Sequence, residues 1–287
     1  MSNQTNHYLP SFGKILEVKQ ENSLIKSFLV SVPDSMQIAQ VVPGQFFQLS
    51  ILGYGEIPIS LSELDTEKKT FLFCIANTGA ITAKIHQLQP GDMLGIRGSY
   101  GNGFPIAALK GKNIVVVAGG IGLAPLRSII HYSLMNQGYF NYMEVLFGAK
   151  STADFIYREE IKQWRLKPNT TIKVTIDNPE KGWNGNVGFV TNFLQDKCPD
   201  HSEVLYNIDP SFENTVILVV GPPVMYRNVF RALEKIEFPD KQVYLSLENH
   251  MKCGIGKCGH CNCGEKYVCL DGPIFSWLEM KSLPKEY

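Results

Sequence analysis

The sequence has no excess of charge, no long apolar run and no export signal at its start. Of 287 residues, 27 are Lys or Arg and 27 are Asp or Glu, so the formal net charge is zero. A chain without a basic excess lacks the electrostatic footprint of a general nucleic-acid binder. The longest apolar stretch, Ile114–Leu126, is well short of the about 20 residues that a membrane-spanning helix needs. Residues 1–10 lack the basic and apolar regions of a signal peptide, so we expect a cytoplasmic protein with no membrane span.

What is present is the composition of a globular protein rich in turns. The hydrophobic fraction is 44%, the charged fraction is 19%, and there are 25 glycines and 16 prolines. This composition excludes a disordered chain or a coiled coil. The length exceeds what one small core needs and suits two domains with an appendage.

Residues 1–108 have the pattern of a small antiparallel β-barrel. Short runs rich in β-branched and aromatic residues, such as Phe28–Val32, Gln45–Leu49 and Thr70–Ile75, alternate with Gly, Pro, Asn and Asp. Closely spaced short strands of this kind predict a barrel. A single helical pattern interrupts them, at about Thr82–Leu88.

Residues 109–247 have a different pattern, in which strands alternate with helices. A continuous apolar run at Asn113–Ala118 is typical of a strand buried on both faces. The other predicted strands are Met143–Gly148, Thr171–Ile176, Thr215–Val220 and Gln242–Leu247, and the predicted helices are Pro125–Met135, Glu159–Trp164 and Val224–Lys235. Such alternation predicts a doubly wound parallel sheet that binds a nucleotide.

Cysteine is concentrated near the end of the chain, since five of the seven fall within residues 253–269. In a reducing compartment clustered thiols more often bind metal than form disulfides. We therefore expect residues 248–287 to form a small lobe around a metal. Cys74 lies in an apolar run and is expected to be a small buried residue, and the sequence predicts no role for Cys198.

The spacing of these cysteines favours an iron–sulfur cluster. Cys253, Cys258, Cys261 and Cys269 follow the plant-type pattern of [2Fe–2S] proteins. Cys258 and Cys261 can bind one iron, and the four-residue gap before them carries the chain from Cys253 at the other iron. Cys263 is separated from Cys261 by one residue, which makes joint ligation awkward, so Cys269 is the expected fourth ligand. A structural zinc site is the alternative.

Two glycine-containing turns follow predicted buried strands. Tight turns of this kind bring backbone amides and a helix N-terminus against a pyrophosphate, although any tight strand–helix turn can use glycine. The expected NAD(P)H-binding residues are Gly119, Gly120, Gly122, Ala124 and Pro125 in the first turn and Gly221, Pro222, Pro223 and Met225 in the second. Lys150 and Ser151 follow the next strand and are candidates for a 2′-phosphate contact or for plain surface residues, which leaves NADH against NADPH open.

The order of these motifs resembles ferredoxin reductase-like flavoproteins that carry a C-terminal [2Fe–2S] cluster. The resemblance covers nearly the whole chain and is closest to the electron-transfer subunits of anaerobic sulfite reductase and of sulfhydrogenase, the latter called gamma. The segments that carry it are Gly55–Ser60, Arg97–Pro105 and Cys253–Phe275. It implies three parts: a flavin-binding barrel over 1–108, an NAD(P)-binding domain over 109–247 and a cluster lobe over 248–287.

The resemblance also implies a flavin site, with FAD favoured over FMN. Pro58, Ile59 and Ser60 match the family's Arg-Pro-x-Ser motif, in which the serine lies near flavin N5, so Ser60 is the expected catalytic residue. Ile57 replaces the motif's arginine, which removes a charged contact to the diphosphate. Asn77, Gly79 and Thr82 are the other expected flavin-binding residues, and a helix N-terminus there would partly replace the missing charge. The alternative is that the side chains of Ser60 and Thr82 only stabilise a turn or cap a helix.

The function implied is that of an NAD(P)H diaphorase subunit. A nicotinamide gives two electrons at once and a cluster takes one, and a flavin, which has a stable one-electron state, can stand between them. The expected partner is an anaerobic sulfite reductase, with an NAD(P)-linked [NiFe] sulfhydrogenase, working in either direction, as the alternative. A free-standing oxidoreductase and a non-catalytic, zinc-stabilised binding module are further alternatives. Glu248, just before the cysteines, is either close to the nicotinamide or simply exposed.

Overall fold

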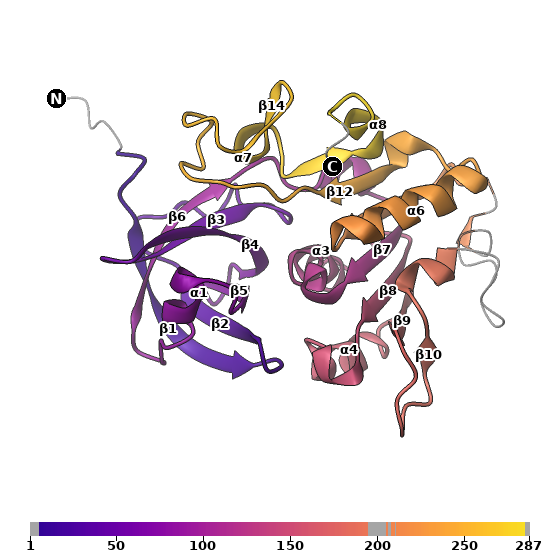
Figure 1. Cartoon of the computed structure of the whole chain (residues 1–287), viewed down its shortest axis with the longest axis horizontal. Coiled ribbons are helices and arrows are strands. Elements are labelled where there is room, and N and C mark those ends of the chain that lie inside the picture. The colour runs from indigo at the N-terminus through magenta and orange to yellow at the C-terminus, as the bar shows by residue number, and fades with distance from the viewer. Residues whose placement is uncertain (1–5, 195–204, 206–207, 210, 285–287) are drawn as a thin grey trace. The chain divides into compact units, whose positions relative to one another are not determined.

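The computed structural model describes residues 6–194, 205, 208–209 and 211–284. The chain divides into two compact units, Met1–Phe104 with Leu247–Pro273, and Pro105–Ser246 with Ile274–Tyr287 (Figure 1). The segment that the sequence predicts as one lobe, 248–287, is therefore divided between the two units. Cys198 lies outside the described residues.

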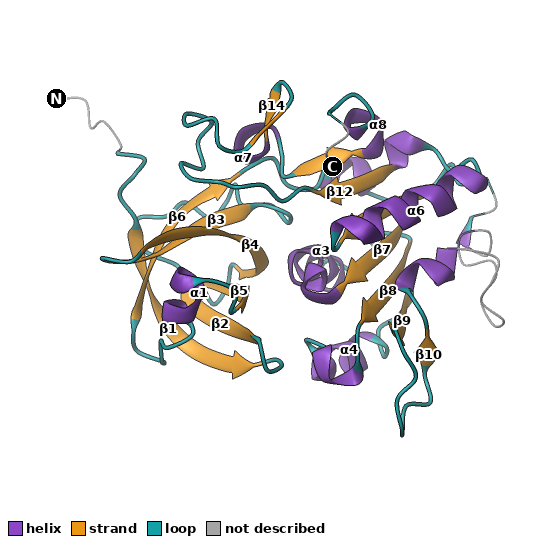
Figure 2. Ribbon diagram, in the orientation of Figure 1, coloured by secondary structure: helices purple, strands orange, loops and turns teal. Residues whose placement is uncertain are grey.

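The first unit contains a closed antiparallel barrel, which confirms the predicted N-terminal fold. Its strands follow the order β1-β2-β5-β4-β3-β6 around the barrel, and every pair is antiparallel (Figure 2). A short helix, α1 (Ala80–Ile85), follows β5 and contacts β3 and β4. The strands are β1 (Ser11–Gln20), β2 (Ile25–Ser31), β3 (Phe46–Ile51), β4 (Gly55–Asp65), β5 (Thr70–Ala76) and β6 (Met93–Tyr100).

Alternation along the barrel strands separates an apolar interior from an outer face. Phe47, Phe71 and Phe73 are fully buried and their rings contact one another, with centroids 4.8–5.8 Å apart. Cys74 is buried in β5, as the sequence predicts. Because successive side chains of a strand point to opposite sides, the neighbours of these core residues face outward, and one patch of that outer face carries polar residues of the candidate site.

The second unit contains a seven-stranded sheet in the order β10-β9-β8-β7-β11-β12-β15. All neighbouring strands are parallel except β12 and β15, which confirms the predicted parallel sheet and adds an antiparallel edge strand. The strands are β7 (Asn113–Gly119), β8 (Tyr142–Ala149), β9 (Thr170–Ile176), β10 (Asn186–Val187), β11 (Thr215–Val220), β12 (Val243–Ser246) and β15 (Ile274–Ser276).

Helices connect and cover this sheet. They are α2 (Ile106–Leu109), α3 (Leu123–Met135), α4 (Arg158–Trp164), α6 (Pro223–Lys235) and α8 (Trp277–Met280), with short 3₁₀ turns η1 (Gly120–Gly122), η2 (Thr152–Asp154), η3 (Val190–Leu194) and η4 (Asp240–Gln242). Helix α3 contacts β7 and β11, and α6 packs against η3. Strand β11 is buried at every residue and β7 at all but its last, as expected for central strands covered on both faces.

The cysteine-rich segment forms part of the barrel unit and has little regular structure. It contains a two-stranded hairpin, β13 (Asn262–Cys263) with β14 (Lys266–Tyr267), and a short helix, α7 (Val268–Asp271). Its far end is tied to the barrel through Asn102, whose backbone N–H donates to the Gly272 carbonyl at 2.7 Å and whose side chain donates to the Asp271 carbonyl at 2.9 Å.

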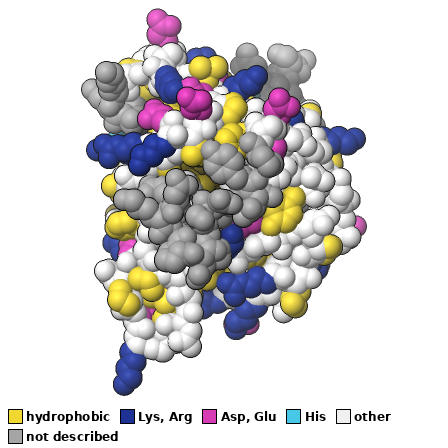
Figure 3. Space-filling view, turned by 90° about the vertical axis from the view of Figure 1, so that its right-hand side faces the viewer, with side chains coloured by type: hydrophobic (Ala, Val, Ile, Leu, Met, Phe, Trp, Pro, Cys, Tyr) yellow, Lys and Arg dark blue, Asp and Glu magenta, His cyan; other side chains and the backbone are white. Residues whose placement is uncertain are grey.

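The chain has equal numbers of acidic and basic residues. On the face drawn in Figure 3, basic and acidic side chains are interspersed and hydrophobic side chains form small separate groups. In the described part of the chain, every helix is too short or too polar to cross a membrane.

Candidate functional site

The expected metal ligands are brought together in the cysteine-rich segment. Cys253, Cys261 and Cys269 are buried, whereas Cys258 is exposed. Cys263, the fifth cysteine, is also buried, in β13. If these cysteines bind a cluster, the exposed Cys258 would leave its own side of the site accessible from solvent.

Backbone amides point at the sulfur atoms of three expected ligands. The N–H groups of Ile255 and Lys257 donate to Cys253 Sγ at 3.4 and 3.3 Å. Cys269 Sγ accepts the Gly256 N–H at 3.2 Å, and Cys261 Sγ accepts the Cys269 N–H at 3.5 Å. Gly256 adopts a left-handed backbone, with φ of 71°, which glycine tolerates best. Amide donors to sulfur are a recurring feature of iron–sulfur sites, where they stabilise thiolates and set the reduction potential.

The four expected ligands are arranged as two contacting pairs. Cys258 contacts Cys253, and Cys269 contacts Cys261. Sharing of one iron by Cys258 and Cys261 stays a prediction, because these contacts between thiols do not place an iron. In the described part of the chain, no three His, Cys, Asp or Glu side chains are grouped around one metal position. Two thiolates on each of two irons is the requirement of a [2Fe–2S] core, and two pairs fit it.

The chemistry of the thiols also fits a bound metal. Burial, together with the neighbouring Cys261 thiol, raises the pKa of Cys269 to about 12. Hydrogen bonds, first from the His260 backbone and then from Cys253, lower the pKa of Cys258. A buried thiol with so high a pKa becomes a thiolate near neutral pH only when a metal ion supplies the positive charge.

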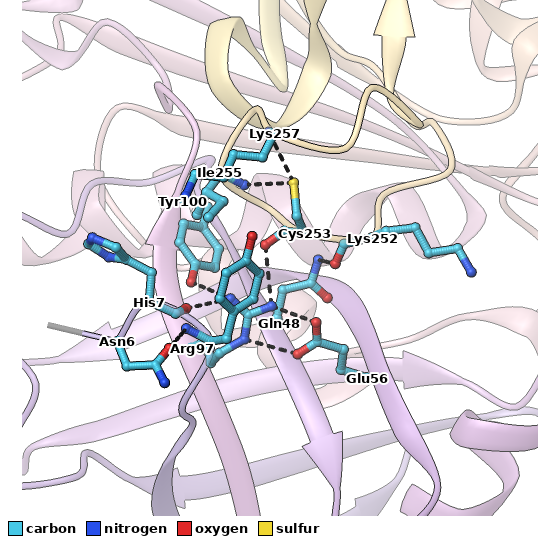
Figure 4. Close-up of polar contacts among 11 residues, drawn as sticks. Asn6, His7, Gln48, Glu56, Arg97, Tyr100, Lys252, Cys253, Ile255 and Lys257 are labelled. Atoms are coloured by element: carbon cyan, nitrogen blue, oxygen red, sulfur yellow. Dashed lines mark hydrogen bonds and ion pairs between the residues drawn. The ribbon is translucent and has the colours of Figure 1, made fainter.

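Polar side chains on the outer face of the barrel hold the backbone around Cys253, the first expected ligand, in place (Figure 4). Gln48 on β3 donates through Nε2 to the Lys252 carbonyl at 3.4 Å. Arg97 on β6 donates through Nη2 to the Cys253 carbonyl at 3.3 Å. Gly254 lies against Tyr100, since a Cβ there would be 3.1 Å from two atoms of its ring. Gln48, Arg97 and Tyr100 were not predicted as site residues, because they lie about 150 positions or more from the cysteines and have no spacing signal.

The predicted flavin residues Pro58 and Ser60 share this outer face. In the barrel register, Pro58 lies opposite Gln48, and Gln48 lies opposite Arg97. Ser60 lies opposite Phe46, which in turn lies opposite Tyr100. Directly opposed residues of neighbouring strands point to the same side of a sheet. The candidate flavin strand and the residues that hold Cys253 therefore form one continuous surface of the barrel unit.

The two residues on either side of Pro58 in β4 point the other way. Ile57 and Ile59 both pack against the apolar core of the barrel. The Ile59 side chain therefore faces inward, so only its backbone could contact a group on the outer face. The same orientation explains why isoleucine suits position 57: the side chain that stands where the family has arginine contributes to the core.

The other predicted flavin residues begin helix α1. Thr82 is buried, and its hydroxyl accepts the N–H groups of Thr78 and Gly79 at 3.0 and 2.8 Å while donating to the Gly79 carbonyl at 2.9 Å. Thr82 thus serves the turn itself, which is the alternative role considered from the sequence. Asn77 and Gly79 are exposed in the turn, and a Cβ on Gly79 would meet nothing within 4 Å.

The two predicted nucleotide turns lie side by side at the carboxyl ends of β7 and β11. These strands are direct neighbours, with Ala118 opposite Val220. A Cβ on Gly119 would lie 2.7 Å from Met225 Sδ, and one on Gly122 would lie 3.0 Å from the Gly221 backbone nitrogen. Met225 is buried and fills the space beneath the glycines. The glycines are therefore needed for the close approach of the two turns.

Both turns lead into helices whose first amides have no side-chain cap. Helix α3 starts after Gly122 and α6 starts after Pro222, and neither N-terminus is capped by a side chain. Pro223 takes the first position of α6, where the missing N–H has no cost. Ala124 is buried and Pro125 is half-buried. Uncapped N-termini of two adjacent helices are suited to bind the negative charge of a pyrophosphate.

The remaining candidates from the sequence are Lys150, Ser151 and Glu248. Lys150 is exposed after β8, and Ser151 Oγ donates to Asp154 Oδ2 at 2.6 Å. Burial raises the pKa of Asp177, which also senses the charges of Lys150 and Asp154. The carboxylates of Asp177 and Asp154 interact with each other at this end of β8, and their negative charge opposes a phosphate there. Glu248 is exposed.

Comparison with protein families identifies two domains that agree with these sites. Residues 116–230 match the oxidoreductase NAD-binding domain. Residues 248–281 match the iron–sulfur cluster binding domain of dihydroorotate dehydrogenase B. The first match includes both glycine turns, and the second includes all five clustered cysteines.

Similar proteins extend over nearly the whole chain. The sulfhydrogenase 2 gamma subunit of Pyrococcus furiosus is 36% identical, covering 96% of this chain and 98% of that one. A probable dihydroorotate dehydrogenase B electron transfer subunit of Thermococcus kodakarensis is 32% identical, covering 82% of this chain and 85% of that one. Among solved structures, an NADH-dependent reduced ferredoxin–NADP oxidoreductase matches with a TM-score of 0.73 and 22% identity, covering 95% of this chain and 89% of that one, which shows a shared fold.

Proposed function

The chain belongs to the family of electron-transfer subunits that includes sulfhydrogenase gamma subunits and those of dihydroorotate dehydrogenase B, and on this premise we propose that it is an NAD(P)H diaphorase. Electrons from NAD(P)H pass through FAD and a [2Fe–2S] cluster to a partner enzyme. One observation carries the proposal. Gln48 and Arg97 hydrogen-bond to the cysteine-rich segment, and they lie on the same surface of the barrel as the predicted flavin residues Pro58 and Ser60.

Cys253, Cys258, Cys261 and Cys269 are the proposed ligands of the cluster. Their arrangement as two pairs supports two irons, and the amides of Ile255, Gly256 and Lys257 would stabilise the ligating sulfurs. The exposure of Cys258 gives electrons a short way out to a docked partner. Cys263, placed in the hairpin, is the proposed non-ligand.

FAD is the proposed flavin, on the outer face of β4 and at the start of α1. Pro58 and Ser60 would contact the flavin ring, with Ser60 beside N5, and Asn77, Gly79 and Thr82 would position the diphosphate. Gln48 Oε1, next to Pro58, is buried and has no hydrogen-bond partner among the described residues. A buried oxygen left unpaired costs about 1–3 kcal/mol, and a bound flavin that donates a hydrogen bond would remove that cost.

The two glycine turns would bind the pyrophosphate of the nicotinamide cofactor. Gly119, Gly120 and Gly122 would let it approach the first amides of α3, while Gly221 and Pro222 would border it from the neighbouring strand. We propose NADH as the preferred cofactor, because the carboxylates of Asp154 and Asp177 after β8 and β9 disfavour a 2′-phosphate. Hydride transfer between stacked rings needs no protein acid or base, so the work of these residues is binding and orientation.

The partner is proposed to be the catalytic part of a hydrogenase-type redox complex. The proposal is supported by 36% identity to a sulfhydrogenase gamma subunit across 98% of its length. A sulfite reductase partner, favoured by the sequence motifs, stays a prediction, as does a cytoplasmic location. Expression of the chain with the catalytic subunits of a hydrogenase or of a sulfite reductase separates these partners, because the true complex copurifies at a fixed ratio and couples NADH oxidation to one substrate.

The proposed diaphorase activity is tested on the purified chain under anaerobic conditions. We expect one FAD per chain, bound iron and acid-labile sulfide in equal amounts, and NADH-dependent reduction of a one-electron dye. A colourless, zinc-containing protein without dye reduction would overturn the proposal and favour the binding module.

A further inference from the structure

Arg97 lies at the centre of a buried polar network beneath the first cluster ligand (Figure 4). It is 3% exposed. Its Nε and Nη2 donate to the two carboxylate oxygens of Glu56 at 2.9 and 2.5 Å. Its Nη1 donates to Tyr100 Oη and to the His7 carbonyl, both at 2.8 Å, and Nη2 also donates to the Cys253 carbonyl at 3.3 Å.

These contacts use the full donor capacity of the guanidinium. Arginine has five N–H donors in a fixed planar fork, and the five contacts engage all of them. Lysine would keep the charge but could not reproduce the two-point contact with Glu56 together with the other three bonds. The geometry is therefore built for arginine and fixes the Cys253 backbone relative to strands β4 and β6.

The charge of Arg97 is maintained in this buried place. Burial alone lowers the pKa of Arg97, but the hydrogen bonds and charges of Glu56 and Tyr100 together more than offset this and raise it above its ordinary value. The two partners differ in exposure, since the side chain of Arg97 is 2% exposed and that of Glu56 is 32% exposed. Water therefore screens the carboxylate more than the guanidinium, so the net electrostatic effect of the pair on the cysteine-rich segment is that of a positive charge.

We propose that the Arg97–Glu56 pair is a positioning site that sets the reduction potential of the cluster. One added electron makes a cluster more negative, and a nearby positive charge stabilises that state. Arg97 therefore raises the potential and Glu56 limits the rise. The inference rests on the proposed function, because it requires a cluster on Cys253 and its three companions.

The rival explanation is that the pair only fastens the segment to the barrel. A fastening role predicts that loss of either partner loosens the segment and moves the potential in the same direction. A charge role predicts opposite shifts, because Arg97→Gln removes a positive charge and Glu56→Gln removes a negative one. The sign of the two shifts therefore separates the explanations.

The experiment is an EPR-monitored redox titration of the purified full chain and its variants. We expect Arg97→Gln to lower the equilibrium constant for cluster reduction about tenfold, equal to 59 mV for one electron, and Glu56→Gln to raise it. Arg97→Lys should keep the wild-type potential while lowering the unfolding temperature. Lys68→Gln is the matched control, because it removes one positive charge from an exposed ion pair with Asp65 on the same barrel, and its potential should not change.

Shifts of the same sign in Arg97→Gln and Glu56→Gln, or no shift in either, would overturn the inference. If Arg97→Gln retains no iron, the comparison of Glu56→Gln with Arg97→Lys decides: an upward shift only in Glu56→Gln supports the charge role, and any other pattern refutes it. Failure of the proposed function gives a different result, a wild-type protein without a cluster signal.

Discussion

Replacement of Gly122 by alanine tests whether the first glycine turn binds the nicotinamide cofactor. Gly122 has an ordinary helical backbone, with φ of −59° and ψ of −15°, so alanine introduces no backbone strain. The added Cβ would lie 2.6 Å from the Val220 carbonyl carbon and 3.0 Å from the Gly221 nitrogen. Both are backbone atoms at the end of a buried strand, so the overlap is relieved only by moving the two turns apart.

The size of the effect follows from this overlap. Overpacking of a close contact costs about 1–3 kcal/mol. If the same displacement draws the turn away from the pyrophosphate, the loss of binding energy raises the dissociation constant for NADH about tenfold for each 1.4 kcal/mol. We expect an increase of about tenfold to a hundredfold, with the flavin and iron content unchanged.

The assay is a titration of NADH into the anaerobic protein, below the unfolding temperature of each variant. Gly138→Ala is the matched control. Gly138 has φ of 79° and open space around its Cβ position, and it lies between α3 and β8, at the amino end of the sheet. That change costs about 1–2 kcal/mol through backbone strain without touching the turns. Wild-type NADH affinity in Gly122→Ala, or equal loss in both variants, would refute the reasoning.

Two further predictions concern the cysteines and the pH dependence of stability. Cys269→Ser should abolish or alter the absorption of the cluster, whereas Cys263→Ser should leave it intact; the reverse result would exchange their roles. Burial raises the pKa of Tyr142 from 10 to about 12, so the folded state favours the neutral phenol. The contribution of this phenol to the free energy of unfolding is complete below about pH 10 and is lost as the pH rises toward 12. Tyr142→Phe should flatten the fall in the free energy of unfolding over that interval in urea titrations, and an unchanged slope would contradict this.

Elements with strong local patterns were predictable from the sequence. Strands β7 and β11 are continuous apolar runs, and the structure buries them as central strands of the parallel sheet. The closed barrel was predictable for a similar reason, since β2, β3 and β5 are short β-rich runs between turn residues. In both units the local pattern and the tertiary environment favour the same element.

The anchoring of the cysteine-rich segment was not predictable, because it depends on pairs far apart in the sequence. Arg97 and Cys253 are separated by 156 positions, and Arg97 and Glu56 by 41. The contacts among the cysteines were not predictable for a related reason. Spacing predicts only that Cys258 and Cys261 can share one iron, which stays a prediction, whereas the contacts of Cys258 with Cys253 and of Cys261 with Cys269 depend on the fold of the segment.

The most direct test of the central claim is an EPR spectrum of the anaerobic protein before and after addition of NADH, with iron and sulfide counted on the same sample. The proposed function predicts two irons and two sulfides per chain, no signal in the oxidised protein, and a one-electron [2Fe–2S] signal that NADH generates. A protein that contains the cluster but gives no such signal with NADH, while dithionite does produce it, would contradict the proposed route from nicotinamide to cluster.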